Sequence, residues 1–559
     1  MSDIRPLVGM MCLPILSCAP SEQARLDAAL ETITAEDLGR HVEVLASDEF
    51  GGRLPATEGE AKTTQYLAAQ FEALGLQPAN DGSWFQEVPL VSITADPSMA
   101  LSFRYRGRVR QYAYGEGFMA WTKRVVPAVE LEDSEMVFVG YGIVAPEYEW
   151  DDYAGLDVAG KTVVILVNDP GYATGDAELF KGNAMTYYGR WTYKYEEAAR
   201  QGAAAALIVH ETGPAGYGWN VVSGSWAGPQ FDLVAADDNL SRVKVEGWLQ
   251  VDAARELFNM GGLDYDQLKA AAAGRDFVPA TLPVRASISI RNEIERSSSD
   301  NVLALLSGTD RADQYVLYMA HWDHLGRDSG LEGDQIYNGA FDNASGTAAL
   351  LEIAQAYASL DPAPSRSVVF FATTAEEQGL LGSAHYAENP VFPLPETVAA
   401  INMDGINTYG RMTDIVVIGY GNSELDDILA AAAQTQNRTL VPDPEPEKGY
   451  FYRSDHFPLS KKGVPALYTD VGTDHIEHGT EWVTARKNDY RDNRYHQPSD
   501  EYSAAWDLAG GVDDVRLFFR VGYDLTSAAA VTNEFPNWNE GTEFKAARDR
   551  MMADGESIE

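Results

Sequence analysis

The feature that most constrains the fold is a set of short, continuously apolar segments in the second half of the chain. They lack the polar alternation of a half-exposed strand, which is typical of parallel strands buried on both faces. Helical patterns lie between several of them, as in residues 344–360. We therefore predict an α/β fold, a three-layer α/β/α domain with a mostly parallel central sheet. The segments are residues 315–321, 367–375, 398–404, 414–419 and 465–472.

The chain has 559 residues, which is too long for one ordinary core, so more than one domain is expected. Residues 24–95 read as amphipathic helices, and we assign them with residues 296–530 to the α/β domain. Residues 96–295 are dominated by strand-like runs and are predicted to form a separate β-rich insert. The tail, residues 531–559, is polar.

The N-terminus resembles an export signal. Its apolar run, residues 6–17, is too short to span a bilayer as a helix but has the length of a signal-peptide core. The run ends in Ile-Leu-Ser-Cys, which resembles a bacterial lipoprotein cleavage site with Cys18 as the lipidated residue. We therefore expect residues 1–18 to be a signal peptide, and the protein to be periplasmic, anchored in the outer membrane through Cys18, or secreted. Cleavage near the same place without lipidation is the alternative.

Charge and cysteine content exclude several classes of protein. The chain has 42 basic and 84 acidic residues and a formal net charge of −42, so nucleic acid and anionic membrane surfaces would be repelled. An acidic, well-solvated surface or a saline habitat accounts for this charge. The two cysteines, Cys12 and Cys18, both lie near the N-terminus, so neither a disulfide framework nor cysteine-ligated zinc is expected in the mature chain.

Histidines and carboxylates gather where the predicted strands end. Two of these residues are the last residues of predicted strands, two directly follow a strand, and two lie in loops that precede helices. Because functional residues of such sheets collect at the carboxyl ends of the strands, we expect these side chains to meet at one edge. They are His321 and Asp404 at strand ends, Glu376 and Glu377 after a strand, and Asp342 and His496 in loops.

Two imidazoles and three carboxylates would make a metal site for zinc, or for cobalt or manganese. Five ligands exceed one catalytic zinc, which takes three ligands and a water, and fit two metals that share a carboxylate. If Glu377 binds metal, its neighbour Glu376 is left to accept a proton from a water whose pKa the metal lowers to about 7. Asp323, two residues after His321, can hold the second nitrogen of that imidazole.

The motifs around these residues resemble the M28 family of zinc peptidases. They come in the family's order along residues 24–95 and 296–530, as HWDH at 321–324, DNASG at 342–346, AEEQGLLGS at 375–383, NMDG at 402–405 and YH at 495–496. The resemblance implies two metals bridged by Asp342. It implies that Glu377 and His496 complete one site, that His321 and Asp404 complete the other, and that Glu376 is the catalytic carboxylate.

The insert, residues 96–295, resembles a protease-associated (PA) domain. The resemblance lies in residues 138–143, 152–153, 160–164 and 202–209. It implies a lobe that covers the active site and helps to select the substrate.

The expected activity is hydrolysis of peptides by a two-zinc exopeptidase, in the first place an aminopeptidase. An aminopeptidase must hold a free α-amine, whereas a carboxypeptidase needs an arginine for the terminal carboxylate, for which Arg453 is the candidate. Tyr450 or Tyr452 is a candidate donor to the developing oxyanion. A carboxypeptidase or dipeptidase is the nearest alternative. A one-metal glutaminyl cyclase and a non-enzymatic binding protein are further ones, and no oligomeric state follows from the sequence.

The remaining histidines of interest are expected to support the site rather than to bind metal. His324 and His456 are expected to hydrogen-bond near the metals, and Asp455 is a candidate for orienting the site. His475 and His478 are expected at the surface near the substrate mouth.

Overall fold

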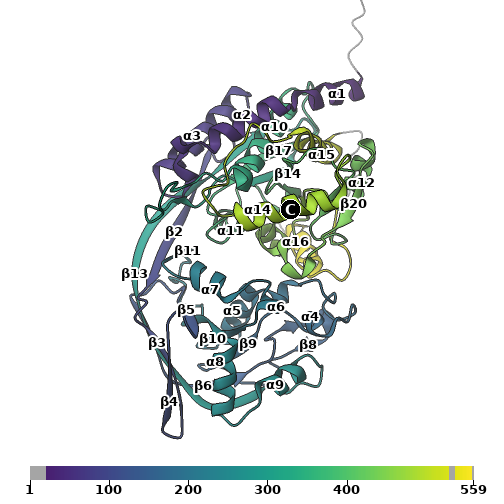
Figure 1. The fold of residues 1–559 in the computed structure, drawn as a ribbon. Helices are drawn as coiled ribbons and strands as arrows, with labels where there is room; N and C mark the ends of the chain where they lie inside the picture. The colour runs from purple at the N-terminus through teal and green to yellow at the C-terminus, as the bar shows by residue number, and fades with distance from the viewer. Residues whose placement is uncertain (1–20, 528–534, 557–559) are drawn as a thin grey trace, which may run out of the picture.

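The computed structural model describes residues 21–527 and 535–556, which form two lobes joined by a long two-stranded ribbon (Figure 1). The predicted signal peptide, with Cys12 and Cys18, lies outside the described residues. Within those residues, no helix combines the length and the apolar character needed to cross a bilayer.

The central sheet of the upper lobe is mostly parallel. Four neighbouring strands run in the same direction, and strands on either side join them antiparallel. In spatial order the parallel strands are β17 (Arg366–Thr373), β14 (Arg311–His321), β18 (Thr397–Asn402) and β21 (Ala466–Asp470), flanked by β13 (Ala280–Leu306) and β19 (Asp414–Val417).

Both faces of this sheet are buried under helices. On β14, Val316 and Tyr318 pack into one core cluster, whereas Leu317 and Met319 pack into another on the opposite face. This explains why the apolar segments show no alternation, and the predicted three-layer α/β/α fold is confirmed. One outer layer holds α2 (Ala35–Leu45), α10 (Gly346–Ala358), α12 (Leu425–Thr435) and α15 (Ala509–Thr526), and the other holds α11 (Leu381–Glu388) and α13 (His456–Lys462).

The N-terminal helices lie against the upper lobe (Figure 1). The amphipathic pattern of residues 26–47 forms two helices, α1 (Glu22–Thr32) and α2. They are separated at Thr34, whose hydroxyl accepts the N–H of Asp37 and thereby caps α2. The third, α3 (Glu58–Ala73), ends just before Gly75, which has a positive φ.

The lower lobe, formed by residues of the insert, contains its own mixed sheet with a parallel centre. Its strands lie in the order β4 (Arg108–Ala113), β3 (Ala100–Tyr105), β13, β6 (Ala128–Phe138), β9 (Thr162–Leu166), β10 (Ala205–His210), β12 (Val245–Gln250) and β5 (Phe118–Trp121). Helices α5 (Trp191–Arg200), α7 (Trp219–Ser225), α8 (Val251–Met260) and α9 (Tyr265–Ala272) belong to the same lobe.

One strand, β13, belongs to the sheets of both lobes. The first half of β13 pairs with β6 in the lower lobe. Its second half pairs with β2 (Phe85–Ala95) and then with β17 in the upper lobe.

Two further helices lie late in the chain, α14 (Gly479–Asn493) and α16 (Lys545–Glu556).

Candidate metal centre and catalytic carboxylates

The strands of the upper sheet bring the predicted ligands together. His321 is the last residue of β14, Asp404 lies two residues beyond β18, and Glu376 lies three beyond β17. These strands are parallel neighbours, so their carboxyl ends meet at one edge. The turn before α10 places Asp342 there, and the segment after α14 places His496 there.

The donor atoms have the spacing of metal ligands. His321 Nε2 lies 3.3 Å from Asp342 Oδ1 and 3.3 Å from Asp404 Oδ1. His496 Nε2 lies 3.3 Å from Asp342 Oδ2 and 3.1 Å from Glu377 Oε2. Ligands held at about 2.0–2.1 Å around a tetrahedral zinc are separated by about 3.3 Å, so these residues fit the metal. Each carboxylate oxygen of Asp342 therefore faces a different imidazole.

The electrostatics of this cluster agree with a cation site. Burial lowers the pKa of His321, but nearby carboxylates, Glu376 foremost, outweigh burial and raise it well above its usual value. Burial raises the pKa of Glu377, yet the neighbouring charge of His496 brings it down to about 2. Carboxylates so closely packed and so buried need compensating positive charge, which divalent ions supply.

Glu376 differs from its neighbour Glu377. Two groups of described residues could each hold a metal ion, one with His321, the other with Glu377, and Glu376 belongs to neither. Its Oε2 lies 4.0 Å from His321 Nε2, at the edge of the cluster. Burial raises the pKa of Glu376 well above its usual value, which suits a carboxylate that must take up a proton near neutral pH.

Asp323 supports both halves of the centre. Its backbone carbonyl lies 3.2 Å from His321 Nδ1, and its carboxylate lies 3.7 Å from the same nitrogen. The carboxylate also accepts the N–H groups of Glu376, at 3.0 Å, and of Glu377, at 3.4 Å. Asp323 therefore holds the imidazole mainly through its carbonyl and the glutamate turn through its side chain.

His324 directly contacts one of the predicted metal ligands, Glu377. Its Nδ1 is 2.5 Å from Glu377 Oε1, and it forms a possible donor group with Asp342 and Glu377. His496 approaches the other oxygen of the same carboxylate. Glu377 therefore lies between two imidazoles, and we assign His324 to orienting Glu377.

The match to known proteins rests on this part of the chain. Residues 301–518 match the model of Peptidase family M28. They form an M28 peptidase domain. This confirms the family prediction, and the M28 domain contains every predicted metal ligand.

Relatives with curated descriptions match short stretches. The mouse protein described as "Aminopeptidase NAALADL1" is 39% identical over 131 residues, which cover 22% of this chain and 16% of the mouse protein. A Caenorhabditis elegans protein described as "Glutamate carboxypeptidase 2 homolog" is 28% identical over 200 residues, or 34% of this chain and 24% of that protein. These matches thus span less than a quarter of each relative.

The whole two-lobed fold has a solved counterpart. The structure of an aminopeptidase from Aneurinibacillus sp. strain AM-1 superposes with a TM-score of 0.51, over 91% of this chain and 98% of that one. Its sequence identity is 20%, so the likeness is one of fold.

Two polar residues that the sequence analysis did not single out hold ligands of the M28 domain. Ser454 donates to Asp404 Oδ2 at 2.6 Å and accepts from Asn402 Nδ2 at 2.7 Å. The carboxylate of Asp500 accepts the backbone N–H groups of Phe341 and Asp342, each at 3.1 Å. Ser454 lies in the segment Ser-Asp-His-Phe and Asp500 in the segment Tyr-His-Gln-Pro-Ser-Asp. These two polar segments are the sequence features from which both residues could have been predicted.

Arg53 supports the same loops from the N-terminal segment. It is buried, and its guanidinium donates to the carbonyls of Trp322, Asn338 and Gly339 at 2.6–2.8 Å. Burial lowers its pKa to about 10, while the carboxylates of the M28 domain, Asp323 foremost, favour its charged form. No local pattern in residues 48–53 indicates this long-range role.

Asp455 and His456 lie beneath the centre. The hydroxyls of Thr373 and Ser383 donate to the Asp455 carboxylate, and burial raises the pKa of Asp455 to about 6. His456 packs between Phe451 and Tyr468, and burial lowers its pKa to about 3.

We expect His456 to make the fold acid-sensitive. Its pKa is about 6.5 when unfolded and about 3 when folded, so the unfolded state takes up the proton first as the pH falls below 6.5. Between pH 7.5 and 5.5 this one group should remove about 1.4 kcal/mol of stability. Urea unfolding at both pH values measures this loss. From pH 7.5 to 5.5, the free energy of unfolding of His456→Asn should fall by about 1.4 kcal/mol less than that of the wild type. Equal drops in the two proteins would show that His456 is not the buried neutral base.

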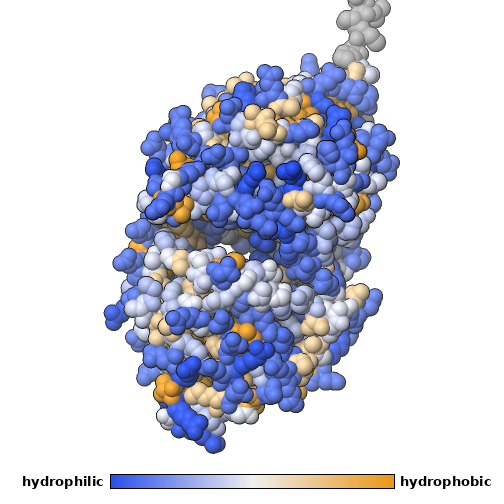
Figure 2. Space-filling view, viewed as in Figure 1, coloured by the Kyte–Doolittle hydropathy of each residue, from blue (hydrophilic) through white to orange (hydrophobic). Residues whose placement is uncertain are grey.

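The metal centre opens into a cavity of about 1200 Å³. Glu376, Glu377 and His496 line it from the M28 domain, and Arg190 and Trp226 line it from the lower lobe. The molecular surface is hollowed between the two lobes (Figure 2). Substrate reaching Glu376 would therefore contact both lobes.

The predicted substrate residues Tyr452 and Arg453 both line this cavity. The hydroxyl of Tyr452, however, donates to Glu543 at 2.6 Å in a partly buried contact. That carboxylate engages the hydroxyl of Tyr452, and Tyr450 is the other residue predicted to donate to the developing oxyanion. Arg453 is exposed to the cavity and stacks over Tyr450, with 5.4 Å between guanidinium carbon and ring centroid.

A second arginine, Arg190, faces the same cavity from the lower lobe. Its Nε is buried and has no hydrogen-bond partner among the described residues. Burial, and after it the charge of Arg453, lower the pKa of Arg190 to about 10. Both arginines also favour ionisation of Tyr217, so the two guanidinium groups lie near one another. Neither has a carboxylate partner among the described residues.

Proposed function

We propose that the protein is a two-zinc exopeptidase that removes the N-terminal residue from peptides. The observation that carries this proposal is Asp342, whose two carboxylate oxygens face two different imidazoles at 3.3 Å. Glu377 and His496 would hold one metal, and His321 and Asp404 the other. The description of the mouse relative as an aminopeptidase supports the same choice.

When bound, the metals would polarise the scissile carbonyl and lower the pKa of a water molecule. Glu376 would accept a proton from the attacking water and pass it to the leaving amine. The carboxylate of Asp323 accepts the backbone N–H of Glu376 and so holds this residue in place, and Ser454 fixes the orientation of Asp404. The lower lobe, which we propose acts as a PA-type cap, would limit access of water and of long substrates to Glu376.

A second candidate function is cleavage directed by a substrate carboxylate, as in a dipeptidase or carboxypeptidase. Arg190 and Arg453 favour it, because two neighbouring guanidinium groups without carboxylate partners form a site for a carboxylate. The description of the nematode relative as a glutamate carboxypeptidase homologue also supports it.

Four substrates separate the candidates: Leu-Gly, Leu-Gly amide, N-acetyl-Leu-Gly and leucine p-nitroanilide. We expect an aminopeptidase to cleave every substrate with a free amine and to leave N-acetyl-Leu-Gly intact. Cleavage of N-acetyl-Leu-Gly would instead identify a carboxypeptidase. Loss of cleavage after chelation would tie the activity to the metal centre.

The arginines predict a preference within this set. A charge-assisted hydrogen bond contributes about 1.5–3 kcal/mol, so kcat/KM for Leu-Gly should exceed that for its amide by about 10- to 100-fold. Arg190→Ala and Arg453→Ala should each reduce this ratio and leave leucine p-nitroanilide hydrolysis nearly unchanged. Arg110→Ala, at an exposed ion pair with Glu256, is the control. If the ratio of kcat/KM for Leu-Gly to that for its amide is unchanged in both Arg190→Ala and Arg453→Ala, cleavage is not directed by a substrate carboxylate.

A further inference from the structure

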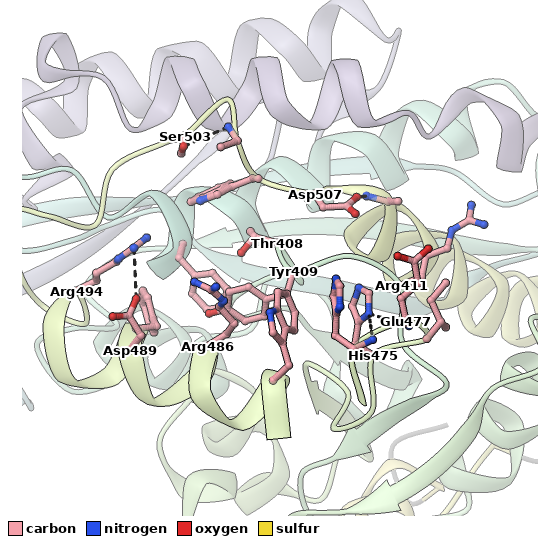
Figure 3. A pocket seen from close by; sticks show the side chains of 18 of the residues that line it. Thr408, Tyr409, Arg411, His475, Glu477, Arg486, Asp489, Arg494, Ser503 and Asp507 are labelled. Carbon is pink, nitrogen blue, oxygen red and sulfur yellow. Dashed lines mark hydrogen bonds and ion pairs between the residues drawn. The ribbon is translucent and has the colours of Figure 1, made fainter. Parts of the chain in front are cut away.

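A second cavity, of about 740 Å³, lies in the M28 domain between helix α14, residues 503–509 and residues 408–411 (Figure 3). Neither Glu376 nor any of the predicted metal ligands is among the described residues that line it. His475 and His478, which were expected near the substrate mouth, line this cavity and not the one into which the metal centre opens. The cavity is therefore separate from the proposed catalytic site.

One side of this cavity is aromatic. The rings of His475, His478 and Trp482 contact one another with centroids 4.6–5.0 Å apart. Tyr409 and Phe341 form a second stacked pair, with centroids 6.3 Å apart. Trp482 is only half-buried. Flat, partly exposed rings of this kind bind an aromatic ligand by stacking or by edge contacts.

The cavity also presents charges of both signs. The guanidinium of Arg486 lies over Trp482, 5.1 Å from the ring centroid, and has no carboxylate partner among the described residues. The carboxylates of Glu477, Asp489 and Asp507 line the same cavity, and that of Asp489 is 3.4 Å from Arg494 (Figure 3). A ligand with one carboxylate and one ammonium group would find a partner for each.

The back wall of the cavity supports the metal centre. Asp500 lines the cavity and accepts the backbone N–H of Asp342 at 3.1 Å. Tyr490 of α14 donates to Asp500 at 3.2 Å and packs on Phe341, with centroids 4.5 Å apart. Helix α14 ends three residues before His496. A molecule bound in this cavity would therefore contact Asp500, which holds Asp342, and helix α14, which leads to His496.

We propose that this cavity binds a free aromatic α-amino acid. The ring of the ligand would lie against Trp482, and its carboxylate would pair with Arg486. Its ammonium group would face the carboxylates that line the cavity, those of Glu477, Asp489 and Asp507. That such a ligand is also a product of the enzyme rests on the proposed function. The binding site itself rests only on the cavity, and its test requires no peptide hydrolysis.

Calorimetric titration of the full-length protein with L-phenylalanine tests the proposal. We expect saturable binding that weakens at least about ten-fold for phenethylamine, which lacks the carboxylate, and for 3-phenylpropionate, which lacks the ammonium group. Trp482→Ala and Arg486→Gln should each weaken L-phenylalanine binding by about ten-fold or more. Because Arg486 is exposed, its variant also covers the case in which Trp482→Ala fails to fold.

Two controls separate this cavity from the catalytic one. Arg491→Gln changes an arginine of the same helix that pairs with Glu445 and does not line the cavity, so it should bind as the wild type does. Glu376→Gln should also bind normally. Loss of binding in Glu376→Gln, unchanged binding in Arg486→Gln, or no saturable binding by the wild type would each overturn the proposal. Binding without peptidase activity would leave it standing while the proposed function fails.

Discussion

Glu376→Gln should retain its metal and lose nearly all activity. The substitution keeps the size of the side chain and removes its ability to accept a proton. General acid–base catalysis contributes about 10²- to 10⁴-fold, so kcat should fall by that factor. KM should change little, because the donor atoms around Asp342 do not include Glu376. Steady-state kinetics on leucine p-nitroanilide, with metal analysis of the same sample, measures both quantities.

The control for this variant is Glu388→Gln. Glu388 lines the same cavity but forms an exposed ion pair with Lys462, at 2.8 Å. It should hydrolyse the substrate at the wild-type rate. Near-wild-type kcat in Glu376→Gln would show that another group takes the proton, whereas loss of metal in this variant would make Glu376 a ligand.

Asp342→Ala should lose both metal and activity. Asp342 faces an imidazole with each of its oxygens, so its removal takes a ligand from both proposed metal positions. We expect hydrolysis to fall below detection and metal content to fall by at least one ion per chain. Metal analysis after dialysis, together with activity in added zinc, measures the effect.

Folding must be checked in this variant, because Asp342 is buried. Circular dichroism should be unchanged, since the backbone N–H of residue 342 still donates to Asp500. Asp133→Ala, at an exposed ion pair with Arg104 in the lower lobe, is the control and should keep two metals. Retention of two metals by Asp342→Ala would remove its bridging role.

The layers of the peptidase domain and the location of its site were predictable from sequence because they depend on local patterns. Continuous apolar segments indicate strands buried on both faces, and the residues that end such strands meet at one edge. His321, Glu376 and Asp404 follow this rule.

Contacts between distant segments were not predictable in the same way. Arg53 binds carbonyls about 270 to 286 positions away, and no motif announces such a contact. The engagement of Tyr452 by Glu543 joins the site to a segment read only as a polar tail. Arg190, from the insert, reaches the cavity between the lobes because β13 belongs to both sheets and fixes the two lobes face to face.

The metal stoichiometry of the full-length protein tests the central claim most directly. The protein would be treated with chelator, dialysed and titrated with zinc while bound metal and peptide hydrolysis are followed together. Our account predicts two zinc ions per chain and hydrolysis that returns as they bind. Saturation at a single ion, or full hydrolysis by the metal-free protein, would contradict it.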